Sequence, residues 1–321
     1  MKVLSVSFLW VVSSFLVSSV FAESERYRFA TYNFWNLKDF LVSLSSHNRE
    51  RATRVCDILR DQKDEGWDAL FGQEIWREED GRDILTDCGY QAIDRNLEVE
   101  TGLVTFVRND FSILDVRTEK FSVRGLPYIF NPDGEYAVRK GYLAIKVETP
   151  VGQTFWLINT HLIAWYGDKK NLRKMPRTYN GHREIQLREL WFFAKSLQKE
   201  DPEVPIVLAG DFNSGPEPLS KTPESWELIR KLFLELFQQV EYDSSSVETF
   251  SAKNDILKPN GDKQVKEGEG KIDHIFFTEP LKAIPESGHY VFDQKYDLGN
   301  GVTSYLSDHF GWEVELELEA E

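Results

Sequence analysis

The stretch VPIVLAGDFN, residues 204–213, runs from an apolar segment directly into two polar side chains. Its first part, from Val204 to Ala209, is short, apolar and partly β-branched, which is typical of a strand buried on both faces. Gly210 then permits a bend in the chain, and Asp211 and Asn213 follow it. Asp and Asn at a strand end are most often turn formers. The stretch therefore predicts a buried strand and leaves the role of its polar end open.

Five further apolar runs carry polar side chains at one end in the same manner. They are RFATYNFWNL with Asn33, WDALFGQEIW with Gln73 and Glu74, QTFWLINTHL with Asn159 and His161, EGKIDHIFF with Asp273 and His274, and YLSDHFGWEVEL with Asp308 and His309. A strand end at the rim of a sheet places a polar group rigidly without burying an unpaired charge. If all six ends meet at one rim, a single cleft collects Asn33, Glu74, His161, Asp211, Asn213, Asp273, Asp308 and His309.

These residue types indicate a site for a hard cation. Each residue alone could be a turn former or a hydrogen-bonded core histidine, but the repetition over six strands favours a functional cleft. Carboxylate and carboxamide oxygens suit Mg²⁺, with Mn²⁺ or Co²⁺ as substitutes. Zinc is disfavoured because the cysteines and histidines lack its usual spacings. The sequence has no G-x-S-x-G elbow and no glycine-rich nucleotide loop, which argues against a serine hydrolase or a P-loop enzyme.

Short strand-like runs alternate with three amphipathic helical patterns, and this order predicts an α/β fold. The helical patterns cover residues 52–59, 187–194 and 229–240. From Trp312 to Glu319, apolar residues alternate with glutamates, which predicts a last strand with one buried and one solvated face. No long linker interrupts the chain after residue 22. We therefore expect a single layered α/β sandwich over residues 23–321.

The first 22 residues have the pattern of a secretory signal. Lys2 precedes an apolar run from Val3 to Val20, and small residues lead to a cleavage site after Ala22. An uncleaved N-terminal anchor is the alternative. We expect a secreted chain, extracellular or periplasmic, with no transmembrane segment after cleavage.

Charge and cysteine content narrow the partners and the compartment. The net charge of −15 disfavours nucleic acid as a partner, because proteins that grip polyanions usually present a basic face. The two cysteines, Cys56 and Cys88, are expected to form a disulfide or to be two buried thiols. We expect a monomer.

At its polar strand ends the chain resembles the endonuclease/exonuclease/phosphatase superfamily. The pairs and motifs QE at 73–74, GDFN at 210–213 and SDH at 307–309 match that superfamily in order, and the match extends from about residue 27 to 318. The resemblance implies a metal-dependent phosphodiesterase or phosphatase with a four-layer α/β sandwich, two packed sheets flanked by helices, as in the DNase-I-like fold.

Within that superfamily the chain looks most similar to the neutral sphingomyelinases. The motifs that carry this likeness are THLIA at 160–164, HREIQLREL at 182–190, GDFNSGPEPL at 210–219, TFSAKND at 249–255 and FSVRGLPYIFNPDGEYAVRKGYLAIKV at 121–147. Ile163 departs from the branch, which often has a polar residue there. The vertebrate membrane-bound enzymes carry two spanning helices after the catalytic domain, whereas this chain ends with its last strand. In architecture it resembles the secreted bacterial enzymes.

The resemblance implies a role for each residue of the cleft. Metal binding falls to Glu74, with Asn33 nearby and Asp308 beside the ion. The general base is His309, oriented by Asp273. Asp211 and Asn213 position water and phosphate or assist the leaving group, and His161 donates to a phosphoryl oxygen.

Two segments are candidates for contact with a lipid surface. Trp165 and Tyr166 precede a cluster of basic residues between 169 and 183, and such a combination suits the headgroup region of a membrane. A solvated loop is the alternative. The segment 125–142, which includes Lys140 of the Lys-Gly pair as a weak candidate for substrate or membrane contact, could equally be a packed hairpin.

The sequence thus predicts a secreted Mg²⁺-dependent phosphodiesterase that acts at a bilayer surface. The expected reaction is the sphingomyelinase C-type hydrolysis of sphingomyelin to ceramide and phosphocholine. A secreted DNase-I-like nuclease, a phosphomonoesterase or inositol-phosphate hydrolase on the same fold, and a catalytically inactive binding domain remain as alternatives.

Overall fold

The computed structural model describes most of the chain after the predicted signal. The described residues are 24–36, 45–61, 66–76, 82–94, 101–125, 139–164, 176–216, 223–239, 248–251, 253–256 and 270–318. The predicted signal segment, residues 1–22, lies outside them. Within these ranges, no helix combines the length and the apolar character that crossing a bilayer requires.

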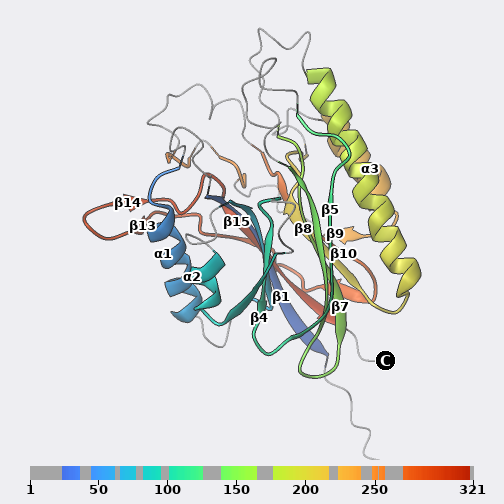
Figure 1. Cartoon of the computed structure of the whole chain (residues 1–321), viewed down its shortest axis with the longest axis horizontal. Coiled ribbons are helices and arrows are strands. Elements are labelled where there is room, and N and C mark those ends of the chain that lie inside the picture. Colours follow the sequence, from blue (N-terminus) through green and yellow to red (C-terminus); the bar gives the residue numbers. More distant parts are fainter. Residues whose placement is uncertain are drawn as a thin grey trace, which may run out of the picture.

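The first sheet has seven strands and carries both chain-terminal strands near its centre (Figure 1). Its order is β11-β15-β1-β2-β4-β3, and β12 also pairs with β15. The strands are β1 (Glu25–Asn36), β2 (Ala69–Ile75), β3 (Tyr90–Ile93), β4 (Val104–Arg108), β11 (Leu281–Ala283), β12 (His289–Val291) and β15 (Gly311–Leu318).

The second sheet has six strands in the order β5-β6-β7-β8-β10-β9. They are β5 (Ser112–Lys120), β6 (Gly141–Glu148), β7 (Thr154–His161), β8 (Ile206–Asp211), β9 (Gln238–Gln239) and β10 (Asp273–Phe277). A separate two-stranded hairpin consists of β13 (Tyr296–Asp297) and β14 (Thr303–Ser304).

Three apolar cores hold four layers together. Phe29 and Phe71 of the first sheet meet Leu157 and Val207 of the second sheet in the central core. The outer face of the first sheet packs on α1 (Asn48–Asp61) and α2 (Arg82–Thr86). The outer face of the second sheet packs on α3 (Pro176–Glu200) and α4 (Pro223–Phe233). Figure 1 shows α1 and α2 on one side and α3 on the other. The predicted four-layer α/β sandwich is confirmed.

Strand direction brings the polar strand ends to one rim. Strand β1 is parallel to β2, and β7 is parallel to β8, so the carboxyl ends of each pair lie side by side. In the second pair, His161 is in register with Asp211. The antiparallel strand β10 begins where β8 ends, so Asp273 pairs with Asp211. Likewise, β15 runs antiparallel to β1 and begins beside its carboxyl end, with Thr31 opposite Trp312. Because neighbouring strands run in opposite directions, the first residues of one strand and the last residues of another can line the same cleft.

Two local expectations are wrong. The third helix ends at Phe233 rather than continuing to residue 240, and the following residues form a turn in which Phe237 still packs into the core. Glu313 is fully buried rather than solvated. Its carboxylate accepts hydrogen bonds from the Arg28 guanidinium, at 2.6 Å, and from Trp67 Nε1, at 2.5 Å. These two donors offset the free-energy cost of burying the charge. Because they lie on other segments, the alternation of residues along the last strand does not reveal them.

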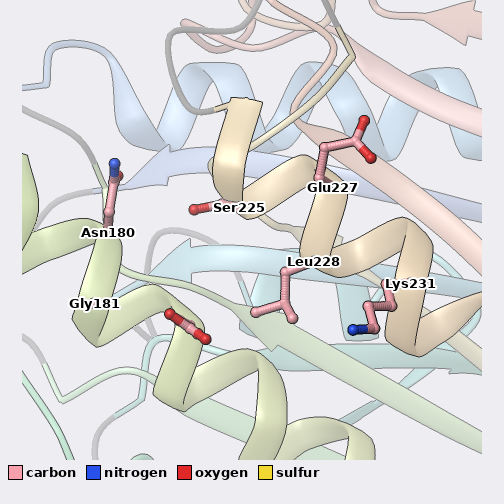
Figure 2. Close-up of a pocket in the computed structure, with 7 residues that line it drawn as sticks. Asn180, Gly181, Ser225, Glu227, Leu228 and Lys231 are labelled. Atoms are coloured by element: carbon pink, nitrogen blue, oxygen red, sulfur yellow. The ribbon is translucent and has the colours of Figure 1, made fainter.

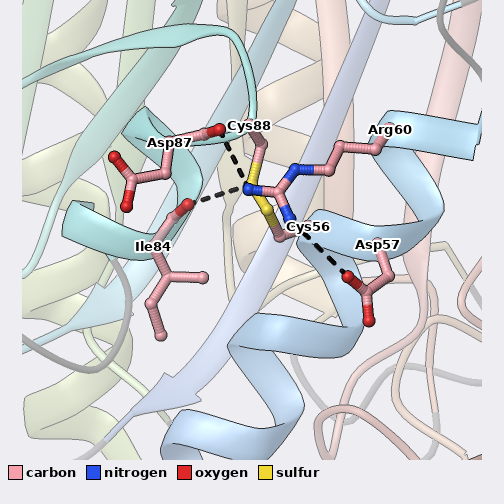
Figure 3. Close-up of a disulfide and its surroundings, with 6 residues drawn as sticks. All are labelled: Cys56, Asp57, Arg60, Ile84, Asp87 and Cys88. Atoms are coloured by element: carbon pink, nitrogen blue, oxygen red, sulfur yellow. Dashed lines mark hydrogen bonds and ion pairs between the residues drawn. A yellow bond between two sulfur atoms is a disulfide. The ribbon is translucent and has the colours of Figure 1, made fainter.

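The cysteines form a disulfide, which resolves the alternative that the sequence left open. Cys56 of α1 is bonded to Cys88, just after α2 (Figure 3). Next to the bond, Arg60 donates a hydrogen bond to the main-chain oxygen of Asp87. The disulfide therefore joins the two helices that cover the first sheet.

Candidate active site

Asp211, the last residue of β8, lies at the centre of the predicted cleft. Its Oδ2 atom is 3.2 Å from Asn33 Nδ2, 3.4 Å from His161 Nε2 and 3.8 Å from His309 Nε2. Glu74 Oε1 is 3.9 Å from the same nitrogen of His161. The structure thus brings together residues from both sheets, and we refer to the eight predicted cleft residues as the rim cluster.

His309 and Asp273 form a buried hydrogen-bonded pair. His309 Nδ1 lies 2.8 Å from Asp273 Oδ2, which leaves Nε2 directed toward Asp211. Burial by itself lowers the pKa of His309, but the Asp273 carboxylate and its hydrogen bond outweigh burial and raise the pKa well above its ordinary value. The Asp273 carboxylate thus fixes the ring and stabilises its protonated form, and the role of His309 as the base stays a prediction.

On the other side of the cleft, Glu74 and Asp308 form an acidic pair. Burial and, to a smaller extent, the charge of Asp308 raise the pKa of Glu74 to about 7. Burial also raises the pKa of Asp308. The Asn33 amide accepts from Trp35 N through Oδ1, at 3.0 Å, and donates toward Asp211 through Nδ2. The side-chain nitrogen of Asn33 thus holds the Asp211 carboxylate, while the side-chain oxygen of Asn33 already accepts a hydrogen bond from the main chain.

The donor set of the rim cluster fits a divalent cation. The buried carboxylate of Asp211 and the half-buried carboxylates of Glu74 and Asp308 all have raised pKa values, and a cation would offset the repulsion between them. Ligand atoms of Asp211, Asp273 and His309 lie within 4.8 Å of one another. Asp273 Oδ1 is buried and has no hydrogen-bond partner within the described part of the chain. Oxygen-rich donors of this kind are those that hard cations prefer.

Lys140 lies inside the site rather than on a lipid-facing surface. It is buried, and its Nζ atom is 2.9 Å from His161 Nε2 and 3.0 Å from the main-chain oxygen of Leu162. Burial lowers the pKa of His161 well below its ordinary value, and the charges of Lys140 and His309 lower it further. His161 is therefore neutral at physiological pH, and Lys140 supplies the positive charge on this side of Asp211.

Asn213 braces the loop that follows β8. Its main-chain N–H donates to Asp211 Oδ1 at 2.8 Å, and its side chain donates to the Leu162 oxygen at 3.0 Å. Asn213 and Glu74 both have a positive φ, 47° and 56°. Such backbone conformations are uncommon for residues other than glycine and cluster at functional sites.

The structure adds supporting residues that the sequence reasoning did not assign. Gln73 Nε2 donates to Asn159 Oδ1 at 2.9 Å, which joins the two sheets directly beneath the rim. Asn254 donates to the main-chain oxygen of Ser307 at 2.6 Å, and the Phe250 ring lies 5.2 Å from the His309 ring. The TFSAKND motif could have pointed to these last two residues, since both belong to it.

A groove on the helical layer is separate from the rim cluster. It has a volume of about 580 Å³ and lies between α3 and α4, where Asn180 faces Ser225 and Leu228 (Figure 2). Arg183, buried beneath it, donates to the main-chain oxygen of Ile163 and ties α3 to the segment after His161. The predicted surface residues Trp165 and Tyr166 lie outside the described residues.

Comparison with known proteins agrees with this geometry. Residues 30–309 match the Endonuclease/Exonuclease/phosphatase family. An inositol phosphosphingolipids phospholipase C from Schizosaccharomyces pombe is 30% identical over 224 residues, which cover 67% of this chain and 48% of that relative. The chain therefore spans about half the length of this relative.

Solved structures confirm the predicted DNase-I-like sandwich. TDP2 from D. rerio, complexed with a single-strand DNA product, is 16% identical with a TM-score of 0.63, over 91% of this chain and 98% of that chain. A mannosyl-6-phosphatase from Bacteroides thetaiotaomicron is 18% identical with a TM-score of 0.61, over 90% of this chain and 99% of that chain. Such identities show the fold alone. The family match, which covers most of the sequence, decides the assignment: the chain belongs to the endonuclease/exonuclease/phosphatase family, whose members hydrolyse phosphoester bonds.

Proposed function

We propose that this protein is a secreted Mg²⁺-dependent phospholipase C-type phosphodiesterase that hydrolyses sphingomyelin to ceramide and phosphocholine. The observation that carries the proposal is the buried His309–Asp273 pair facing Asp211 across a cleft with Glu74 and Asp308. The similarity to an inositol phosphosphingolipids phospholipase C supports a sphingolipid as the substrate. The acidic net charge of −15 weighs against a nucleic-acid substrate.

His309 is placed to activate the attacking water. Its Nδ1–H donates to Asp273, and the neutral ring, with Nε2 unprotonated, accepts a proton from water as the oxygen attacks phosphorus. The raised pKa of His309 makes this neutral form the minor one at neutral pH. The imidazolium that forms is stabilised by Asp273, by the same principle that orients a triad histidine. The bond between phosphorus and the ceramide oxygen breaks, and the leaving oxygen takes up a proton.

We place the phosphate between His309 and a second group of side chains that supply positive charge and hydrogen bonds. The Lys140 ammonium, beside His161, is positioned to stabilise negative charge that develops on the phosphoryl oxygens. Asp211 and Asn213 orient water and the leaving oxygen from the end of β8. Glu74, with Asn33 and Asp308, would hold Mg²⁺, which when bound supplies Lewis-acid stabilisation of the phosphate charge.

Export from the cytosol is part of the proposal. The signal-like residues 1–22 motivate it, and the Cys56–Cys88 disulfide supports it because such bonds persist in oxidising compartments. A matched pair of expression experiments tests it. The full chain should appear outside the cytosol with an N-terminus at residue 23, whereas a chain that lacks residues 1–22 should stay inside. Retention of both forms in the cytosol would contradict export.

A substrate panel tests the reaction. The purified protein is incubated with vesicles of sphingomyelin, of phosphatidylcholine and of inositol phosphosphingolipid, and with plasmid DNA, each with Mg²⁺ or with EDTA. We expect phosphocholine release from sphingomyelin only with Mg²⁺, and release about a hundredfold slower or more from the His309→Ala variant. Cleavage of inositol phosphosphingolipid alone would support the proposed phospholipase C-type reaction but overturn phosphocholine as the headgroup that is released. DNA nicking without lipid turnover would overturn the proposal in favour of a nuclease.

A further inference from the structure

Arg51 of α1 is a buried cation that lies outside the rim cluster. Only 3% of its surface is exposed. A buried charge is costly, and replacing it by a hydrophobic side chain is often neutral or stabilising. Stability alone therefore gives no reason for a guanidinium at this position, and its hydrogen bonds identify what it does.

The first set of these bonds holds the end of β1. Arg51 donates to the main-chain oxygens of Phe34, at 2.9 Å, and Trp35, at 2.9 Å. The pairing of β1 with β2 is irregular between Asn33 and Asn36, and Trp35 has a φ of 48°. Main-chain oxygens at such an irregularity need donors from outside the ladder. Arg51 supplies them directly after Asn33.

The second set holds the segment that carries Asp308 and His309. Arg51 donates to the main-chain oxygen of Leu306 at 2.6 Å. The next residue, Ser307, donates through its hydroxyl to the main-chain oxygen of Asn33 at 2.5 Å. One guanidinium thus joins two segments that are more than 250 residues apart in sequence.

The remaining bonds anchor Arg51 to its own helix and the residues before it. Its Nε donates to the main-chain oxygen of Ser46 at 3.0 Å, and its Nη2 donates to Asn48 Oδ1 at 2.5 Å. All five acceptors are neutral, and no ion pair of Arg51 occurs among the described residues. The planar five-donor fork of arginine can satisfy such a set of acceptors, whereas the three donors of lysine cannot.

We propose that Arg51 is a positioning residue that fixes the Asn33 end of β1 against the Asp308–His309 segment, so that the two sides of the rim cluster keep one spacing. The proposal rests on the proposed function in that the cluster must perform hydrolysis. A displacement of about 1 Å between reacting groups can lower a rate on the order of a hundredfold.

Three variants test this role. Arg51→Met removes the donors and the charge, and Arg51→Lys keeps the charge with fewer donors. Arg60→Met is the matched control, because Arg60 lies on the same helix, half-exposed, beside the disulfide. Each is measured for kcat and KM on sphingomyelin vesicles with Mg²⁺, and, without substrate, for hydrogen exchange in peptides that contain residues 33–36 and 305–310.

For Arg51→Met we expect kcat to fall on the order of a hundredfold with KM within about twofold of wild type. Exchange should accelerate about tenfold in both peptides and stay unchanged in the β8 peptide, 206–211. Arg51→Lys should lie between this variant and wild type in both measurements. Arg60→Met should match the wild type.

The two readouts separate failure of this inference from failure of the proposed function. Wild-type exchange in both peptides of Arg51→Lys would overturn the positioning role, whatever the activity. If Arg51→Met does not fold, the lysine variant decides. If the wild-type protein cleaves no sphingolipid, the proposed function fails, while accelerated exchange in both peptides still supports the role of Arg51.

Discussion

Asp211 shows how a single side chain can connect the two halves of the cleft. One of its oxygens accepts from the Asn213 main chain, and the other faces Asn33, His161 and His309. Burial and, to a smaller extent, the charge of Asp273 raise the pKa of Asp211 to about 6. The charged form of a carboxylate buried in this way is stable only while neighbouring groups donate hydrogen bonds to it. The position of Asp211 therefore depends on the arrangement of the whole cluster.

The His309–Asp273 pair should act as a unit in catalysis. His309→Ala is expected to lower kcat about a hundredfold or more, and Asp273→Asn should lower it because the ring loses its orientation. Since both changes remove the same function, the double variant should be no slower than His309→Ala within about twofold. Steady-state kinetics on sphingomyelin vesicles measure all three. Multiplicative losses in the double variant, or near-normal turnover of His309→Ala, would contradict the pairing.

His274 should make stability depend on pH. Its Nε2 lies 2.8 Å from the Ser214 oxygen and its Nδ1 lies 3.0 Å from Gln239 Nε2, which fixes a neutral ring. Burial lowers its pKa from 6.5 to about 4. Between these values the unfolded chain binds a proton that the folded chain does not, so stability present above pH 6.5 is lost as the pH falls toward 4.

The expected loss from His274 is about 3 kcal/mol. Urea unfolding between pH 4 and pH 7 measures it, and His274→Gln should lose less stability over the same range by about that amount. A ring pKa near 6.5, measured by NMR in the folded protein, would show that His274 does not cause the pH dependence.

At the scale of elements, the approach of β7 to β8 explains the glycine in GDFN. Gly210 has a φ of 151°, and a Cβ built on it would lie 2.0 Å from the main-chain oxygen of Thr160. Gly210→Ala should therefore destabilise the protein by about 2 kcal/mol or more, because main chain must shift. The control is Gly181→Ala in α3, where a Cβ meets nothing within 4 Å and alanine should be stabilising by up to about 1 kcal/mol. Equal denaturation midpoints for the two variants would contradict this account.

The disulfide should stabilise the helical layer without acting in the cleft. Cys56 and Cys88 are 32 residues apart, and closing a loop of that length stabilises the folded state by about 4 kcal/mol. Replacing both cysteines by serine should lower the free energy of unfolding by about that amount and leave kcat unchanged. Loss of kcat in the folded double variant would show that the disulfide itself, in addition to Arg51 of α1, sets the geometry of the site.

At the scale of the whole molecule, cation binding should be coupled to folding. Glu74 and Asp308 are partly buried and acidic, so Mg²⁺ should raise the melting temperature by a few degrees at saturating concentration. Glu74→Gln should melt at a higher temperature than wild type in EDTA at pH 8, because a carboxylate with a pKa raised to about 7 destabilises the fold there. The same variant should no longer respond to Mg²⁺. A response equal to that of wild type would exclude Glu74 as a ligand.

The sequence pattern predicted the sandwich and the membership of the rim cluster because both depend on local signals. A buried strand such as residues 204–209 has its own composition, and six polar ends of the same kind point to one rim. The pattern was wrong at Glu313, where donors from β1 and from Trp67 make burial possible. The pattern was also wrong after Phe233, because the apolar residues keep a helical period there although the helix ends. The main chain turns at this point, and Phe237 still packs into the core.

By itself, therefore, the sequence determined the fold class and the residues of the cleft, since strand composition and strand-end chemistry are properties of short segments. Only the tertiary structure decided that Cys56 meets Cys88, that Lys140 lies against His161, and that Arg51 joins β1 to the segment before Asp308. Each of these contacts joins residues that are distant along the chain. Their distances are set by how sheets and helices pack, and no local period or motif encodes that spacing.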